Sequence, residues 1–337
     1  MEEILVNAFA KINWSIDVLG KLPNGYHQVL MVMQQIDLYD KVKIKWQEGP
    51  WEFEGEEDET TEVNPYEERS SQDPSKTEGI RINLSTSLPY LPTDAKNLAY
   101  KAAALMAETY KKGETGLVEI EIGKVIPVSG GLAGGSSNGA AVLHGLNKLW
   151  ELGLTVSELM ELGTKLGADV AFCIAGQAAL NANLGLQKDP KAGTCAIASG
   201  IGEKLEIIQG MKAWFVLSKP PISVSTAKVY QGLDLQKIKE RPNTEELVAG
   251  IRENNYHKIG KNMVNVLETF SLLEYPSIVY TKNKMLESGK PYKVLMSGSG
   301  PTVLGLFANK SKALTAYYRM KRINKDTFIA KTCTFHQ

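Results

Sequence analysis

Apolar and polar residues alternate over several stretches of the chain, and this spacing is typical of half-buried strands. The alternation runs through 4–19 and 36–46, and the proline, asparagine and glycine at 23–25 predict a turn between these two runs. It returns at 117–125, where Val118, Ile120 and Ile122 alternate with Glu119, Glu121 and Gly123. Before that third run, helix-forming residues with apolar positions at helical spacing predict a helix at 94–106.

The rest of the chain follows a different order of elements. A helix is predicted at 138–152, and Thr155 with Glu158 forms a capping box that opens another helix. Beyond about residue 180, strands are predicted at 213–217, 293–296 and 302–307, and amphipathic helices at 244–252, 256–270 and 311–323. This change of pattern, and a length that suits about two domains, predict a mixed α and β protein with domains at 1–180 and 181–337.

Composition changes this picture in one segment. The 337 residues are 43% hydrophobic and carry no formal net charge, yet the segment 52–78 holds eleven acidic and two basic residues. Such a segment has few aliphatic side chains to bury, so we expect a disordered surface insertion at about 50–78. The remainder of the chain is therefore mildly basic, which suits an anionic small molecule. Its lysines and arginines are dispersed along the sequence, so the charge pattern does not favour nucleic acid as a partner.

The cysteines and the apolar runs indicate the compartment. Cys173, Cys195 and Cys333 lack the spacing of a metal site, and their odd number does not suggest a disulfide framework. The first residues are acidic and lack the basic and apolar regions of a signal peptide. No apolar run approaches the roughly 18 residues of a membrane span. We therefore expect a cytoplasmic protein without membrane contact.

Two glycine-rich segments follow predicted strands. In the first, at 127–138, four glycines leave the backbone free to point successive N–H groups into one concavity, just where a helix begins. Such a nest, backed by the helix dipole, binds phosphate. It has neither the lysine of a P-loop nor the spacing of a dinucleotide fingerprint, and a tight strand-to-helix turn by itself explains it equally well. A second segment at 297–302 also suits a plain hairpin turn, but two such loops in one chain favour a phosphate site.

Three segments resemble the motifs of one enzyme family. The segment 127–138 resembles the phosphate-binding motif of the GHMP kinases, which include galactokinase, homoserine kinase, mevalonate kinase and phosphomevalonate kinase. Residues 8–13 and 297–302 are similar to the family's other two motifs, in the family's order. The resemblance implies an ATP-dependent small-molecule kinase with an α+β, two-domain GHMP kinase fold. Its N-terminal domain would be like domain 2 of ribosomal protein S5, its C-terminal domain ferredoxin-like, and its active site would lie in the cleft between them.

The resemblance also assigns catalytic and nucleotide-binding residues. Asp169 would take the proton of the acceptor hydroxyl, and Lys11 would lie beside it, keep it ionised and meet charge on the transferred phosphoryl group. Taken alone, Asp169 also suits a buried aspartate that caps a turn, and Lys11 an exposed lysine. The residues expected to hold ATP are Asn97, Leu98 and Lys124 near the adenine, and Pro127, Ser129, Gly130, Gly131, Leu132, Ala133, Gly134, Gly135, Ser136 and Ser137 around the phosphates. We further expect Mg²⁺ as a cofactor, with Ser137 as its contact.

Four other segments resemble those GHMP kinases whose acceptor alcohol carries a diphosphocytidyl group. They are residues 11–13 followed by 24–27, the run 124–127 before the glycine loop, residues 166–170, and residues 225–230. The acceptor-binding residues that this resemblance implies are Asn13, Tyr26, His27, Tyr230, Ser297, Gly298, Ser299 and Gly300.

The implied cytosine site depends on stacking and on hydrogen bonds. Tyr26 and Tyr230 would lie on the two faces of the ring, where stacking is worth roughly 1–3 kcal/mol per base. His27 and Asn13 would supply the hydrogen bonds that select cytosine over another base. Without the resemblance, the two tyrosines suit ordinary half-buried aromatics and His27 a loop histidine.

Two other functions stay open at this point. The acceptor could instead be homoserine or a mevalonate-type alcohol, although such relatives are not expected to combine residues like 24–27 with Tyr230. The chain could also be a catalytically silent member that binds a ligand and regulates a partner, against which the presence of Lys11, Asp169 and both glycine loops argues. We expect a monomer or a homodimer.

Overall fold

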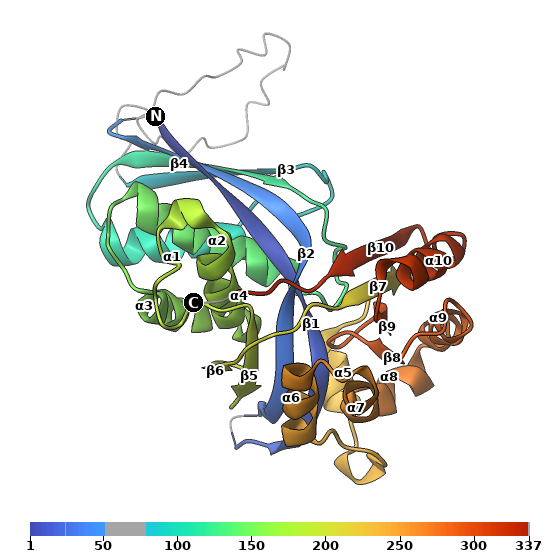
Figure 1. Ribbon diagram of the computed structural model, residues 1–337. Helices are drawn as coiled ribbons and strands as arrows, with labels where there is room; N and C mark the ends of the chain where they lie inside the picture. Colours follow the sequence, from blue (N-terminus) through green and yellow to red (C-terminus); the bar gives the residue numbers. More distant parts are fainter. Residues whose placement is uncertain (24, 51–78, 336–337) are drawn as a thin grey trace, which may run out of the picture.

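The computed structural model describes residues 1–23, 25–50 and 79–335. Asn24 of the predicted turn and nearly all of the acidic insertion predicted at 50–78 lie outside these ranges. Two long strands, β1 (Glu2–Lys21) and β2 (His27–Glu48), pair in antiparallel fashion along most of their length. Figure 1 shows that they run down the middle of the molecule, so that both halves are built against them.

The first half is a sheet covered by helices. Its strand order is β3-β4-β2-β5-β6, with β1 paired to β2, and only β3 and β4 are parallel. The further strands are β3 (Ile80–Thr86), β4 (Gly116–Gly123), β5 (Cys195–Ser199) and β6 (Lys204–Ile207). The helices are α1 (Leu98–Tyr110), α2 (Gly134–Leu149), α3 (Val156–Thr164) and α4 (Ala168–Leu180). Buried side chains of β2 and β4, such as Ile44 and Ile120, form one core with these helices.

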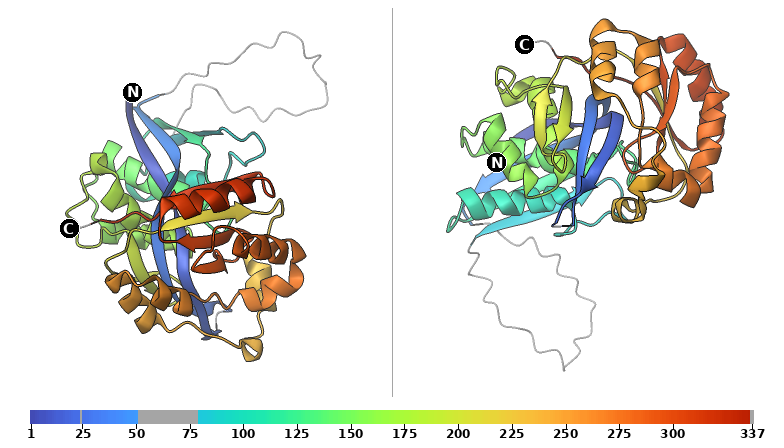
Figure 2. Two further views of the ribbon diagram at one scale, coloured as in Figure 1. Left: turned by 45° about the vertical axis from the view of Figure 1, so that its right-hand side comes forward. Right: turned by 90° about the horizontal axis from the view of Figure 1, so that it is seen from below.

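The second half contains a four-stranded antiparallel sheet of order β10-β7-β9-β8. Its strands are β7 (Trp214–Lys219), β8 (Lys293–Met296), β9 (Val303–Phe307) and β10 (Asp326–Lys331). Its helices are α5 (Thr226–Gly232), α6 (Thr244–Glu253), α7 (Tyr256–Asn262), α8 (Glu268–Glu274), α9 (Pro276–Leu286) and α10 (Lys310–Lys321). Helices α9 and α10 pack against this sheet (Figure 2). The β-α-β-β-α-β order confirms the expected ferredoxin-like C-terminal half.

Burial explains why the predicted strands differ from the observed ones. β2 begins at His27, well before the predicted start at residue 36, because residues 31–36 are buried without interruption. β1 is likewise buried throughout 8–18, where alternation predicted one exposed face. A strand covered on both faces loses the two-residue period, so the sequence pattern does not reveal its length.

The helices also differ from the sequence prediction in two places. Helix α4 has no exposed face over 170–179, so it shows no amphipathic period and is not apparent in the sequence. The single helix predicted at 256–270 is two helices, α7 and α8, with a break between them. In that break, Ile16 of β1 donates to the carbonyl oxygen of Val264 at 2.9 Å and accepts from the amide of Val266 at 3.0 Å. These pairings to a distant strand replace the helical hydrogen bonds.

The chain crosses between the two halves more than once. β5 and β6, which follow residue 180, still belong to the first sheet, and the second sheet begins at Trp214. The domain division at residue 180 stays a prediction. After β10 the chain returns to the first half, where the amide of Cys333 donates to the carbonyl oxygen of Gln35 at 2.8 Å. Within the described ranges, no helix has both the length and the apolar character needed to cross a membrane.

His144 makes folding stability sensitive to acid. It lies on α2 with 1% of its surface exposed, Nε2 donates to the carbonyl oxygen of Ile174 at 3.0 Å, and Nδ1 has no partner among the described residues. Burial lowers the pKa of His144 from 6.5 to about 4. Between these two values the unfolded chain takes up a proton that the folded chain does not, so stability falls as the pH falls. We expect the free energy of unfolding to drop by about 2 kcal/mol from about pH 7.5 to about pH 5.

Denaturant titrations at several pH values measure this effect. The variant His144→Gln retains an N–H donor but has no titratable ring, so its unfolding free energy should vary less over the same window. If wild type and variant lost stability in parallel, His144 would not be the group responsible.

Candidate active site

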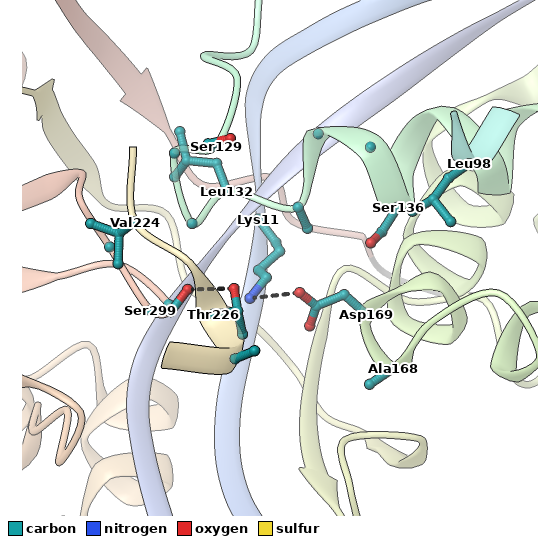
Figure 3. A pocket seen from close by; sticks show the side chains of 18 of the residues that line it. Lys11, Leu98, Ser129, Leu132, Ser136, Ala168, Asp169, Val224, Thr226 and Ser299 are labelled. Atoms are coloured by element: carbon teal, nitrogen blue, oxygen red, sulfur yellow. Dashed lines mark hydrogen bonds and ion pairs between the residues drawn. The ribbon is translucent and has the colours of Figure 1, made fainter. Parts of the chain in front are cut away.

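A cavity of about 840 Å³ opens between the two halves of the protein. That is ample for small-molecule ligands, since typical ligand sites measure roughly 300–1,000 Å³. Its walls come from β1, the loop at 127–133, the first turns of α2 and α4, helix α5 and the loop at 298–300. Figure 3 shows the Lys11 ammonium group next to Asp169, with Thr226 and Ser299 on the other side of Lys11.

The two glycine-rich loops contact each other backbone to backbone. Ser297 donates from Oγ to the carbonyl oxygen of Gly131 at 3.0 Å. A methyl group on Gly131 (φ +72°) would lie 2.2 Å from the carbonyl oxygen of Ser297, and one on Gly298 (φ +56°) 2.8 Å from the carbonyl oxygen of Gly131. Only glycine allows both the left-handed backbone and this approach. The second loop is fixed in turn by Asn265, which donates from Nδ2 to the carbonyl oxygens of Met296 and Gly298, both at 2.8 Å.

The first glycine loop ends in a helix N-terminus that opens into the cavity. Ala133 is the N-cap of α2, with a left-handed backbone (φ 58°, ψ 28°) and no side-chain cap hydrogen bond. Gly134, Gly135 and Ser136 follow and line the cavity. The first N–H groups of a helix lack helical partners and carry its positive dipole end, so this position suits phosphate.

Lys11 and Asp169 form an ion pair at the cavity wall. Lys11 is 3% exposed, and its Nζ lies 3.4 Å from Oδ2 of Asp169 and donates to Oδ1 of Asn13 at 2.9 Å. Asp169 stands in the first turn of α4, directed into the cavity, with 33% of its side chain exposed. A carboxylate next to a cation and open to a cavity can accept a proton from a bound hydroxyl. The structure therefore brings the two predicted catalytic residues together.

Asn13, which was predicted to contact the acceptor, lies behind Lys11. It is fully buried and does not line the cavity. Its Oδ1 accepts from Lys11, and its Nδ2 points to the sulfur of Met31 at 3.7 Å. Asn13 therefore fixes the position of the Lys11 ammonium group.

The three residues predicted to lie near the adenine, Asn97, Leu98 and Lys124, all line the cavity. Asn97 is also the N-cap of α1: its Oδ1 accepts from the amide of Ala99 at 3.0 Å, and its Nδ2 donates to the carbonyl oxygen of Pro92 at 2.9 Å. Its side chain therefore shapes the wall of the cavity at the start of α1.

Asp40 anchors Lys124, and the sequence reasoning missed it. It is fully buried, pairs with the Lys124 ammonium group, and accepts from the amides of Val125 and Ile126 at 2.7 and 2.8 Å. Its other oxygen also accepts from Nδ2 of Asn138 at 2.9 Å. The signal was present in the pattern, because Asp40 occupies an inward, otherwise apolar position of the alternating run 36–46.

The aromatic residues predicted for the acceptor, Tyr26, His27 and Tyr230, line another part of the cavity. The rings of His27 and Tyr230 are 5.3 Å apart between centroids and inclined by 41°. Tyr26 lies at the rim and is 60% exposed. Burial, with the charge of Lys21 adding to it, lowers the pKa of His27, so its ring is neutral at pH 7 and offers one donor and one acceptor. Burial and the negative charge of Asp169 raise the pKa of Tyr230, which stays protonated.

Three of the four residues predicted in the second glycine loop reach the cavity. Gly298, Ser299 and Gly300 line the cavity, whereas Ser297 is fully buried beneath them. The hydroxyls of Ser299 and Thr226 are 2.8 Å apart, which ties the loop to the start of α5 (Figure 3). Thr226 was not among the predicted site residues.

Ser137 does not fit its predicted role as a magnesium contact. It is fully buried and absent from the cavity wall, and its hydroxyl donates to the carbonyl oxygen of Phe9 at 2.7 Å. Its neighbour Ser136 lines the cavity instead. Successive helical residues differ in direction by about 100°, so one of two adjacent serines can face the cavity while the other faces the core. In the described part of the chain, no group of three or more His, Cys, Asp or Glu side chains could hold a metal ion, which is compatible with magnesium bound chiefly by nucleotide phosphates and water.

Comparison with known proteins agrees with this geometry. Residues 97–177 match the family described as GHMP kinases N terminal domain, and residues 247–326 match GHMP kinases C terminal. The chain is 42% identical over 333 residues to 4-diphosphocytidyl-2-C-methyl-D-erythritol kinase of Alkaliphilus metalliredigens, covering 98% of this chain and 97% of the relative. It is 42% identical over 336 residues to the kinase of the same name of Clostridioides difficile, covering 98% and 96%.

Solved structures share the fold. A crystal structure of 4-(cytidine 5'-diphospho)-2C-methyl-D-erythritol kinase superposes with a TM-score of 0.69 at 23% identity, over 98% of this chain and 99% of that one. A homoserine kinase from Cytophaga hutchinsonii superposes with a TM-score of 0.64 at 18% identity, over 100% and 96%. The expected two-domain α+β architecture is confirmed.

Proposed function

The chain belongs to the GHMP kinase family, and from this premise we propose the reaction that its cavity carries out. The protein is a 4-diphosphocytidyl-2-C-methyl-D-erythritol kinase: it transfers the γ-phosphoryl group of ATP to the 2-hydroxyl of that compound, in the non-mevalonate route to isoprenoid precursors. The observation that carries the reaction is the Lys11–Asp169 pair, which lies in one cavity with the phosphate nest and with the His27–Tyr230 aromatic pair.

The residues of this cavity divide the work of phosphoryl transfer. Such reactions need positioning and charge stabilisation more than covalent chemistry. Asp169 accepts the proton of the attacking hydroxyl, and the Lys11 ammonium group faces charge that develops on the transferred group. The N–H groups at the start of α2 hold the phosphates of ATP, and the second glycine loop closes the site from the other half.

Magnesium fits the site as a partner of the nucleotide. When bound, the ion would offset the negative charge of the phosphates. Ser136 is the residue of α2 that would contact it, because its hydroxyl lines the cavity while that of Ser137 does not. ATP and Mg²⁺ are thus proposed as cofactors, with the adenine next to Asn97 and Leu98.

The acceptor side should distinguish cytosine from uracil. A neutral His27 and the half-buried Tyr230 offer a stacking surface with a hydrogen-bond donor and acceptor, and a site built for one pattern of hydrogen bonds leaves polar groups unpaired with the other base. We expect cytidine diphosphate to bind at least about tenfold more tightly than uridine diphosphate. Calorimetric titration of both nucleotides measures the ratio, and His27→Ala should reduce it. Equal affinities for the two nucleotides would contradict a cytosine site.

A panel of acceptors tests the function as a whole. ADP release is followed with 4-diphosphocytidyl-2-C-methyl-D-erythritol, homoserine and mevalonate as acceptors, each with Mg²⁺ and ATP. We expect turnover only with the diphosphocytidyl compound. Turnover with homoserine or mevalonate would leave the assignment to the GHMP kinase family intact but would show that the proposed acceptor is wrong. If none of these alcohols were phosphorylated, the silent, ligand-binding alternative would be revived.

The location and assembly of the protein are also part of the proposal. We propose a cytoplasmic enzyme, which the free state of all three cysteines, Cys173, Cys195 and Cys333, supports, since disulfides are rare in the reducing cytosol. We propose a monomer or a homodimer that acts on a small molecule, to be determined by light scattering.

A further inference from the structure

One buried hydroxyl joins the three elements that carry the reacting groups. Ser137, on the first turn of α2, donates from Oγ to the carbonyl oxygen of Phe9 on β1 at 2.7 Å. Gln177, on α4, donates from Nε2 to Oγ of Ser137 at 3.0 Å and to its carbonyl oxygen at 2.8 Å. Both side chains are fully buried. Strand β1 and helices α2 and α4 therefore meet at this hydroxyl.

Each of these elements leads directly to the reaction centre. Lys11 lies two residues after Phe9, and its amide donates to the carbonyl oxygen of Leu132 in the first glycine loop at 3.2 Å. Asp169 stands in the first turn of α4, about two turns before Gln177. The start of α2 is the phosphate nest itself. A shift of any one element would change the 3.4 Å distance between Lys11 and Asp169, or their distance to the phosphates.

The backbone at Phe9 needs such a partner. The pairing of β1 with β2 changes register between Phe9 and Lys11, so the regular ladder is interrupted there. Backbone groups at such an irregularity lose their ladder partners and must find others. With its amide nitrogen turned toward β1, Gln35 donates to the carbonyl oxygens of Phe9 and Ala10 at 3.1 and 3.0 Å. Gln35 from β2 and Ser137 from α2 thus fix β1 just before Lys11.

Gln177 makes hydrogen bonds through the NH₂ group of its side-chain amide. Its Oε1 has no hydrogen-bond partner among the described residues, although it is buried. An unpaired buried carbonyl oxygen costs free energy, so an apolar side chain of similar length would be cheaper at this position if packing were the only demand.

We propose that Ser137 is a positioning residue, which with Gln177 holds Lys11 and Asp169 in register with the phosphate nest. The inference rests on the proposed kinase function and deepens it. The hydroxyl of Ser137 donates a hydrogen bond to the carbonyl oxygen of Phe9 and accepts one from Nε2 of Gln177. Both of its hydrogen-bonding directions are therefore used by protein groups. The proposed contact with magnesium is therefore made by Ser136, one residue earlier.

Steady-state kinetics of Ser137→Ala, Gln177→Met and the double variant test this role. We expect each single variant to lower kcat about tenfold or more, with both KM values and the half-saturating Mg²⁺ concentration within about twofold of wild type, because a small misplacement of reacting groups costs rate rather than binding. The double variant should be no slower than the slower single variant, since both changes break one network. Ser136→Ala should instead raise the half-saturating Mg²⁺ concentration.

Other outcomes would overturn the inference. If Ser137→Ala raised the half-saturating Mg²⁺ concentration about tenfold and excess Mg²⁺ restored kcat, Ser137 would be a metal contact. If both single variants kept wild-type kcat while only their thermal midpoints fell, the network would be structural alone. If Ser137→Ala fails to fold, the kinetics of Gln177→Met alone decide the question.

The wild-type enzyme in the same assay separates this inference from the proposed function. Should wild type prefer another acceptor of the panel, the proposed function fails, and the ratio of variant to wild type is measured on that acceptor. If no alcohol reacts, the ratio is measured on ATP hydrolysis, with water as the acceptor.

Discussion

Replacing Asp169 by asparagine is expected to lower kcat by about 10² or more, the usual contribution of a general base. The amide has nearly the shape of the carboxylate but cannot take the proton of the acceptor hydroxyl, and it ends the ion pair with Lys11. KM for ATP should change little, because the glycine loops proposed to hold the nucleotide lie on other elements. Initial rates of ADP release with saturating acceptor measure the effect.

Asp234→Asn is the matched control for this substitution. Asp234 is an exposed carboxylate that caps a short 3₁₀ turn, where its Oδ1 accepts from the amide of Gln236 at 3.0 Å. It does not line the cavity, so its variant should retain wild-type kcat. Near-normal turnover of a folded Asp169→Asn enzyme would mean that another group receives the proton.

The sequence predicted those parts of the site that short, contiguous motifs encode. The two glycine loops, Lys11 and Asp169 all lie at the cavity, because each motif contains its own turn or strand and needs only to be brought to one place. Asp40 escaped notice because a single acid in a strand has no motif. Its role depends on Lys124 and Asn138, which lie far along the chain.

The orientation of neighbouring residues was harder to predict than their presence. Ser136 and Ser137 are identical in type and adjacent, and only the phase of α2 decides which one faces the cavity. Asn13 was expected to contact the acceptor; in the structure it is fully buried and its Oδ1 accepts from Lys11. Alternation could not reveal this, since it disappears where a strand is covered on both sides.

Gly131→Ala is expected to damage both stability and catalysis. A methyl group there would lie 2.2 Å from the carbonyl oxygen of Ser297 and 3.1 Å from that of Gly300, and both atoms belong to the backbone of the second glycine loop. The two loops must therefore separate. A displacement of about 1 Å at a reacting group can cost roughly 10² in rate, so we expect kcat/KM for ATP to fall about 10²-fold. Initial rates over a range of ATP concentrations measure this fall.

Gly153→Ala is the control that separates the effect of the steric overlap between the loops from the effect of backbone strain. Gly153 has nearly the same conformation, φ +68° against +72° at Gly131, but no atom lies within 4 Å of the position its methyl group would take. Both variants therefore bear the cost of a left-handed alanine, about 1–2 kcal/mol, while only Gly131→Ala adds the steric overlap. We expect a further loss of about 1–3 kcal/mol in Gly131→Ala, as for other overpacked sites, and normal kinetics in Gly153→Ala. Equal losses of stability and equal kinetics in the two variants would show that the loops do not depend on each other, and the second loop would then have no part in holding the phosphate nest closed.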